Sequence, residues 1–453
     1  MDTSPKTADA PEAFPPGLNN AFLFATFNAL SFPLVVGSPM VLYAKTLGAS
    51  ATVLGLIAGM MPLLVIFQIP AAAHVDRIGY KRFVYAGWGT RVLFIGGMAL
   101  VPLAGRFLDA PNQLVLLLVL LFAFNLSRGI SSCAWLPWIT SLVPPGVRGR
   151  YLSLDAACVN LASFVVIMIA ALLLGHEPHP WQFALLFAVS AAMGAASLVF
   201  LKRIPDVAPP EQVKGSIEPV PWREIARFPP FRKLLRFNMA WAVVYGGLSA
   251  FTVAWLKGEA HMTEGEVLSM TSVAFIGGLS SLWLLGSRMD RLGSKPVLAT
   301  SMLIWLVILA GWVALAGGLL TPTRPVVMTL MFFMGLLASL VGMANVRLAM
   351  AIIPVLGRNH FFALFSVVGS LTLGLTPVLW GLLLDAFKGV HLRWHGLDVN
   401  GFTLFFAAVA VVCVVALFIS RRLDEPQAAS VETLLREMLI ESPLRAWVRF
   451  WPR

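Results

Sequence analysis

The sequence contains few charged residues. Only 12% of its 453 residues are charged and 58% are hydrophobic, and the mean hydropathy is +0.82. A soluble domain usually carries about 25% charged residues. So few charges are too few to cover a water-exposed surface, and the excess apolar area requires lipid. The composition excludes an ordinary soluble domain and predicts an all-α polytopic membrane protein.

Cysteine is also scarce, and it occurs only as Cys133, Cys158 and Cys413, each within an apolar stretch. This pattern indicates small core residues and gives no disulfide framework and no metal-ligand spacing. The chain has no nucleophile–base set and no phosphate-binding loop, so we expect neither an enzyme, nor a bound cofactor, nor a metal site. The net charge of +11 is spread through short loops, which argues against a nucleic-acid partner.

Residues 1–18 lack the basic start, the apolar middle and the small-residue cleavage site of a signal peptide. We therefore expect the first hydrophobic helix to act as an uncleaved targeting signal. A membrane-spanning helix needs about 20 apolar residues, and the chain has twelve candidate runs. They lie at 19–43, 51–73, 83–104, 112–137, 151–175, 181–202, 237–257, 265–288, 296–319, 326–352, 360–384 and 400–420.

The loops between these runs differ in basic charge. Most of the 33 lysines and arginines fall on the side that holds both termini. The other side carries only Lys45, Arg106, Lys257, Arg324, Lys388 and Arg393. The positive-inside rule then predicts a multi-pass protein of the plasma or bacterial inner membrane with both termini cytoplasmic.

The runs also suggest a division of the chain. We expect a cytoplasmic tail at 1–18, a six-helix bundle at 19–202, a cytoplasmic linker at 203–236, a second six-helix bundle at 237–420 and a cytoplasmic amphipathic tail at 421–453. The linker contains a short amphipathic candidate, 222–228. The tail has an apolar stripe from Val431, followed by Arg, Trp and Phe residues that suit the anionic inner leaflet. A poorly ordered tail is the alternative for its last ten residues.

A charged motif occurs twice. Asp76-Arg77-Ile78-Gly79-Tyr80-Lys81-Arg82 follows the second run, and Asp290-Arg291-Leu292-Gly293-Ser294-Lys295 follows the eighth, with Gly286 upstream. Pro144 and Arg148 after the fourth run correspond to Pro354 and Arg358 after the tenth at nearly the same separation. Two matches at similar separation indicate one fold written twice.

These motifs resemble those of the major facilitator superfamily, whose loop pattern is Gly-x-Leu-Ala-Asp-Arg-x-Gly-Arg-Lys. The first copy here departs from it, with Ala72 in place of the leading glycine. The resemblance covers about 19–421 and implies two pseudo-symmetric six-helix bundles that rock about a central cavity. The first, fourth, seventh and tenth helices would line this cavity. We expect a monomer whose partners are a small-molecule substrate and membrane lipid.

The repeated aspartates suggest a gate. Asp76 and Asp290 end helices on the cytoplasmic side, where each carboxylate can accept backbone N–H groups at a helix start in the opposite bundle. Gly79 and Gly293 permit a tight turn, and the basic residues Arg77, Lys81, Arg82, Arg291 and Lys295 can pair with acids or anionic lipid. An ordinary positive-inside loop is the alternative.

Arg128 is the sharpest candidate for a binding or coupling residue, because it lies within the fourth run, where a charge needs a cavity or a partner. It matches the arginine of the family's Arg-x-x-Gln-Gly pattern, but the glutamine and the glycine of that pattern are missing. The alternative is a structural hydrogen bond, for example with Asn125. Arg91 lies about 12 Å into the third helix, from where its side chain is expected to reach the interface.

Other polar residues in the runs are weaker candidates. Asp155 is a first-turn dipole partner or a proton site, and Arg347 reaches the interface or joins a gate with Asp155. The amides that could line a cavity are Asn28, Gln68, Asn125, Asn238 and Asn345. Two functions follow: a secondary active or facilitative transporter of a small organic, possibly anionic, solute by alternating access, or a non-transporting assembly factor or sensor on the same fold.

Overall fold

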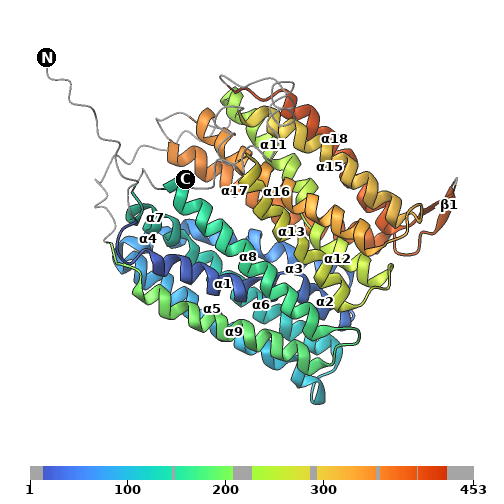
Figure 1. Cartoon of the computed structure of the whole chain (residues 1–453), viewed down its shortest axis with the longest axis horizontal. Coiled ribbons are helices and arrows are strands. Elements are labelled where there is room, and N and C mark those ends of the chain that lie inside the picture. Colours follow the sequence, from blue (N-terminus) through green and yellow to red (C-terminus); the bar gives the residue numbers. More distant parts are fainter. Residues whose placement is uncertain are drawn as a thin grey trace, which may run out of the picture. The chain divides into compact units, whose positions relative to one another are not determined.

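The structure is a computed structural model that describes residues 14–144, 148–207, 227–285, 293–353, 358–394 and 396–425 (Figure 1). The chain divides into two compact units. Unit 1 comprises Met1–Tyr43 and Leu64–Gly215, and unit 2 comprises Ala44–Leu63 and Ser216–Arg453. The expected tail stripe, most of the linker helix, and the motif residues Gly286, Asp290 and Arg291 lie outside the described residues, as does the side chain of Asp76.

Twelve helical segments in the described residues are long and apolar enough to cross a membrane, which confirms the prediction from sequence. They are Asn19–Thr46, Ala51–Ala72, Tyr80–Arg106, Ala110–Leu142, Tyr151–Leu174, Pro180–Arg203, Pro229–Gly258, Glu264–Leu282, Ser294–Ala316, Arg324–Ile352, Leu364–Ala386 and Gly401–Arg421. Helices satisfy their own backbone hydrogen bonds, which is why this sequence can fold in lipid.

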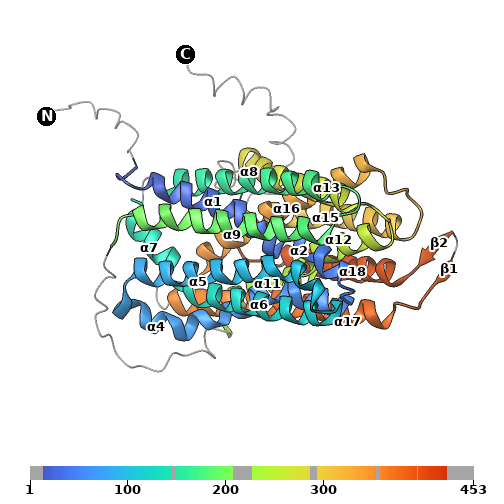
Figure 2. The same ribbon diagram turned by 90° about the horizontal axis from the view of Figure 1, so that it is seen from below.

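Several of these spans are broken into shorter helices. Unit 1 contains α1 (Asn19–Val36), the start of α2 (Ser38–Thr46), η1 (Leu64–Phe67), α4 (Gln68–Ile78), α5 (Tyr80–Leu100), η2 (Val101–Arg106), α6 (Ala110–Ser131), η3 (Ser132–Ala134), α7 (Trp135–Leu142), α8 (Arg148–Leu174) and α9 (Pro180–Arg203). Helix α1 packs against α8 and α9, and α5 packs against α6 and α9 (Figure 2).

Unit 2 is built in the same way around its own helices. It contains α3 (Ala51–Leu63), α11 (Pro229–Tyr245), α12 (Leu248–Gly258), α13 (Glu264–Leu285), α15 (Ser294–Ala316), α16 (Arg324–Ile352), α17 (Arg358–Ala386), β1 (Leu392–Trp394), β2 (Leu397–Val399) and α18 (Gly401–Arg421). The strands pair antiparallel, with Arg393 opposite Asp398. Helix α13 packs on α16, α15 packs on α18, and α17 packs on both α3 and α11.

The glycine of each motif copy has a positive φ. Gly79 joins α4 to α5 with φ 87°, and Gly293 precedes α15 with φ 81°. L side chains rarely adopt a positive φ, whereas glycine does so readily. Both positions therefore favour glycine.

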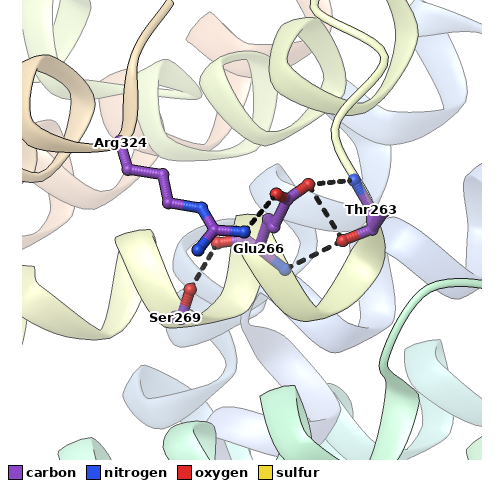
Figure 3. Close-up of polar contacts among 4 residues, drawn as sticks. All are labelled: Thr263, Glu266, Ser269 and Arg324. Atoms are coloured by element: carbon purple, nitrogen blue, oxygen red, sulfur yellow. Dashed lines mark hydrogen bonds and ion pairs between the residues drawn. The ribbon is translucent and has the colours of Figure 1, made fainter.

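At the other end of unit 2, α13 begins with a capping box (Figure 3). Thr263 Oγ1 accepts a hydrogen bond from the Glu266 N–H at 3.3 Å, and Glu266 Oε2 accepts from the Thr263 N–H at 3.0 Å. Arg324, at the start of α16, pairs with Glu266 Oε1 at 2.7 Å. These contacts satisfy free N–H groups at the start of α13 and fasten it to the helix on which it packs.

Candidate functional site

Unit 1 contains a small cavity of about 180 Å³ between the side chains of α1, α5, α7 and α8. It is lined by Phe24, Ala25, Asn28, Ala29, Phe32, Pro33, Trp88, Trp135, Asp155, Val159 and Ser163. Its aromatic wall is continuous, because Phe24 and Trp135 have ring centroids 4.8 Å apart and Trp88 lies 6.2 Å from Trp135. The sequence-predicted residues Asn28 and Asp155 are therefore brought to one cavity.

Arg91 of α5 is buried beside this cavity, with only 5% of its surface exposed. Its Nη2 donates to Asn28 Oδ1 at 3.1 Å, and its guanidinium carbon lies 4.0 Å from the centroid of the Trp88 ring. The expectation that Arg91 reaches the membrane surface is wrong. The helix places this residue on the inner face of the bundle, where an amide and an aromatic ring hold it.

Arg128 of α6 lies close to the same cavity. Its guanidinium carbon lies 5.3 Å from the centroid of the ring of Phe32, a lining residue. In the described chain Arg128 has no hydrogen-bond or ion-pair partner. Asn125 does not bind it, because the Asn125 amide donates to Leu121 O of its own helix at 2.9 Å. The structural alternative for Arg128 is not supported by any contact with Asn125.

The two arginines come close because α5 and α6 approach closely. Gly87 of α5 faces Ser131 of α6, and a Cβ atom at position 87 would collide with it. Ser127 Oγ donates to the Gly87 carbonyl at 3.0 Å across the same contact. Small residues at helix contacts are typical of membrane proteins, since they let backbones approach. This packing brings two cations into one bundle interior.

Asp155 lies one turn into the transmembrane part of α8 and contributes to the cavity wall. Among the described residues it forms no hydrogen bond, and it makes no ion pair with either arginine. Asp155 thus lines the cavity, and the two arginines contact residues of its wall. In the described chain none of these three charges is neutralised by direct pairing. Unpaired charges inside a membrane span are costly, which makes this cavity the leading candidate for a binding site.

Unit 2 has a separate cavity of about 480 Å³, lined by residues of α11, α16 and α17. Asn345 donates to Asn238 Oδ1 at 3.0 Å on its wall, and Trp241 stacks on Tyr245 with ring centroids 5.4 Å apart. All the residues that line this cavity are uncharged. The predicted amides Asn238 and Asn345 therefore belong together, and they offer hydrogen bonds without charge.

The remaining candidates serve other contacts. Gln68 donates to Ser132 Oγ at 2.5 Å, which joins α4 to η3. Arg347 pairs with Glu425 at 3.0 Å and donates to Ser294 Oγ at 3.2 Å. Glu425 in turn accepts from the Ser294 and Lys295 N–H groups at 2.9 Å and 2.7 Å, so it caps α15.

The basic residues of the first motif copy divide into two kinds. Lys81 donates to the Ile204 carbonyl at 2.8 Å and thereby closes the end of α9, whereas Arg77 and Arg82 are exposed. Cations are favourable at helix C-termini, where unpaired carbonyls gather. Lys81 is thus a structural contact within unit 1 as well as part of the motif.

Sequence reasoning missed Arg91, Trp88, Trp135 and Glu425. Glu425 lies beyond the last predicted span, 400–420. The available signal for Arg91 was its position, far from both ends of the span Tyr80–Arg106. A charge so placed needs a partner or a cavity whichever helix carries it.

The fold and the site define a twelve-span membrane protein with a separate internal cavity in each of two units. Residues 19–286 and 242–453 match the profile of the Major Facilitator Superfamily. The chain belongs to this family, and the resemblance found in its motifs is confirmed.

Solved structures support the same fold. A mutant of the nucleoside transporter NupG is 11% identical, with a TM-score of 0.69 over 90% of this chain and 100% of that one. The xylose transporter XylE from E. coli, in an inward-open conformation, is 14% identical, with a TM-score of 0.68 over 92% and 98%. A bacterial homolog of the human lysosomal transporter Spinster is 15% identical, with a TM-score of 0.64 over 90% and 98%. No curated protein matches the sequence.

Proposed function

We propose that this protein is a secondary active or facilitative transporter that moves a small organic solute by alternating access. Membership of the Major Facilitator Superfamily and the fold shared with nucleoside and sugar transporters support a carrier. The observation that carries the proposal is the cavity of unit 1, where Arg91, Arg128 and Asp155 lie inside membrane spans without ion-pair partners in the described chain.

The solute is an anion. Two arginines and one aspartate border the cavity, so the local charge is positive when all three are ionised. A bilayer-embedded site with excess positive charge is stabilised by a ligand of opposite sign. The uncharged cavity of unit 2 suits a neutral polar or ring-shaped group.

The setting of the carrier follows from the charge distribution of the loops. We propose a multi-pass protein of the plasma or bacterial inner membrane, with both termini in the cytoplasm. It works as a monomer, with lipid and a small-molecule substrate as its partners.

The proposal is tested by flux into proteoliposomes that contain the purified protein. We expect uptake of an organic anion and its loss in Arg128→Gln. Arg106→Gln is the matched control, because Arg106 is an exposed arginine at the end of η2 and is expected to leave uptake unchanged. If ligands bind but none crosses the membrane, the transport function is wrong, and a sensor or assembly factor on the same fold is favoured.

A further inference from the structure

We propose that the cavity of unit 1 takes a head group that accepts hydrogen bonds and carries one negative charge, and that Asp155 fixes this charge number. The inference rests on the proposed transport function for its biological meaning, but it is stated for binding alone. It follows from the hydrogen-bonding groups and the charges that surround the cavity.

The hydrogen-bonding groups come first. A guanidinium only donates, so the Asn28 atom that faces Arg91 at 3.1 Å must be its oxygen. The Asn28 amino group is then left to donate, and it has no partner among the described residues. The Trp88 indole N–H and the Arg91 Nε–H also lack a partner among the described residues, but both atoms are fully buried and do not open onto the cavity. Asn28 lines the cavity, so its amino group is the donor that a ligand there can meet.

A donor left without an acceptor costs about 1–3 kcal/mol, so the Asn28 amino group favours a ligand that accepts hydrogen bonds. A carboxylate has two oxygens that accept, which matches this donor. The cavity volume of about 180 Å³ suits a head group rather than a whole solute of ordinary size. Arg91 positions Asn28 and contributes charge, and Arg128 adds a second charge behind Phe32.

The charges around the cavity then determine how many negative charges the ligand carries. With Arg91, Arg128 and Asp155 ionised, the surroundings hold one excess positive charge, and one negative charge on the ligand brings the site to neutrality. A second negative charge would leave the membrane interior negative beside the Asp155 carboxylate. Removal of the Asp155 charge leaves two positive charges, which a dianion neutralises. Asp155 therefore excludes dianions rather than holding the head group.

The test uses the full-length protein in detergent and three matched sets of compounds. Each set has a neutral, a singly charged and a doubly charged member: butyramide, butyrate and succinate; benzamide, benzoate and phthalate; glucose, gluconate and glucarate. The apparent Kd is measured by ligand-induced thermal stabilisation at pH 7. In the wild type we expect the monoanion of at least one set to bind about tenfold more tightly than its neutral and dianionic partners.

The variants separate charge from structure. Asp155→Asn is expected to shift the ratio of dianion to monoanion affinity by about tenfold toward the dianion, whereas Asp155→Glu keeps the wild-type order. Asp109→Asn, the same chemical change at an exposed acid outside the cavity, also keeps it. Because the readout is a ratio within one preparation, a general loss of stability in Asp155→Asn does not imitate the effect.

Each outcome decides a different claim. Equal binding of neutral and charged members, binding of none of the nine compounds, or an unchanged ratio in Asp155→Asn overturns the inference. Uptake of a neutral compound into proteoliposomes without any preference for anions would leave the carrier function standing and the inference wrong. Binding that follows the expected order of charges, without any flux, would support the inference and contradict the carrier function.

Discussion

Arg91 is a charged residue whose burial is not compensated by a carboxylate. Its partners are one amide oxygen and the face of Trp88, and its Nε has none. A cation–π contact contributes about 2 kcal/mol when desolvated, which is less than the several kcal/mol that removing a cation from water costs. Arg91 therefore lowers the stability of the ligand-free protein, and we expect binding of an anion to offset this loss.

Replacing Arg91 by methionine tests this balance. We expect Arg91→Met to raise the stability of the ligand-free protein by about 1–3 kcal/mol, because an apolar side chain of similar length needs no desolvation. Binding and uptake of the anion are expected to fall at the same time. Thermal denaturation in detergent and flux in proteoliposomes measure the two effects. Arg91→Lys, which keeps the charge, controls for volume; a lower stability for Arg91→Met would mean that Arg91 is a structural residue.

Much of the fold was predictable from single residues, but the contacts of the site were not. Hydropathy located all twelve candidate spans, and the two motif glycines have the positive φ angles that favour glycine. Asn28 and Arg128 were candidates because a polar or charged side chain inside a membrane span is costly unless it has a partner or lines a cavity. The orientation of Arg91 and Asn125 depends on which face each helix buries, and nearly uniform apolar helices carry no such pattern. Only the packing of neighbouring helices supplies it.

Helix ends in both units are fixed by one residue from a distant part of the chain. In unit 1, Lys81 at the start of α5 binds the carbonyl of Ile204 at the end of α9. In unit 2, Glu425, just beyond α18, caps the start of α15 and pairs with Arg347. Each contact joins the third span of a unit to its last one. The sequence repeat thus has a structural counterpart, because each unit has a side chain that binds the end of a distant helix.

Neighbouring acids allow a controlled test of this fastening. Glu425 is buried, with its side chain 4% exposed, whereas Asp424 is 48% exposed and pairs with Lys233, which is 39% exposed. We expect Glu425→Gln to lower stability by about 2 kcal/mol or more, because Arg347 loses its charged partner and α15 loses its cap. Asp424→Asn is expected to change it by less than about 0.5 kcal/mol. Thermal denaturation of both variants in one detergent measures the difference; equal effects would refute a fastening role for Glu425.

The described residues hold twelve helical segments that are long and apolar enough to cross a membrane. Because this number is even, we predict that the two ends of the chain emerge on the same side. The basic loops predict that this side is the cytoplasm. In a bacterial host, a green fluorescent protein fused after Arg453 should fluoresce. Alkaline phosphatase inserted at Gly396, in the exposed turn between β1 and β2, should be active because it reaches the opposite side. Phosphatase activity at Arg453 combined with none at Gly396 would reverse the assignment.

Alternating access requires α3 to change its contacts, because this helix is part of unit 2 although the rest of the same span, from Leu64, belongs to unit 1. Helix α3 packs on α17 along glycines: a Cβ atom at Gly55 or Gly59 would collide with the α17 backbone. Asp385, at the end of α17, holds the start of α3. It accepts from the Ala51 and Thr52 N–H groups at 3.0 Å and 2.8 Å and from the Thr52 hydroxyl at 2.6 Å.

A carboxylate at a helix N-terminus stabilises it by about 1 kcal/mol, so Asp385→Asn should loosen α3 from α17 by a similar amount and raise the undocked population about fivefold. A single cysteine at Leu54, which is buried in α3, reports undocking when Cys133, Cys158 and Cys413 are replaced. We expect Asp385→Asn to increase its labelling by a membrane-permeant maleimide. Asp398→Asn, which removes an exposed acid from the β1–β2 hairpin, should leave labelling unchanged. Equal labelling in all three proteins would mean that Asp385 does not control the docking of α3.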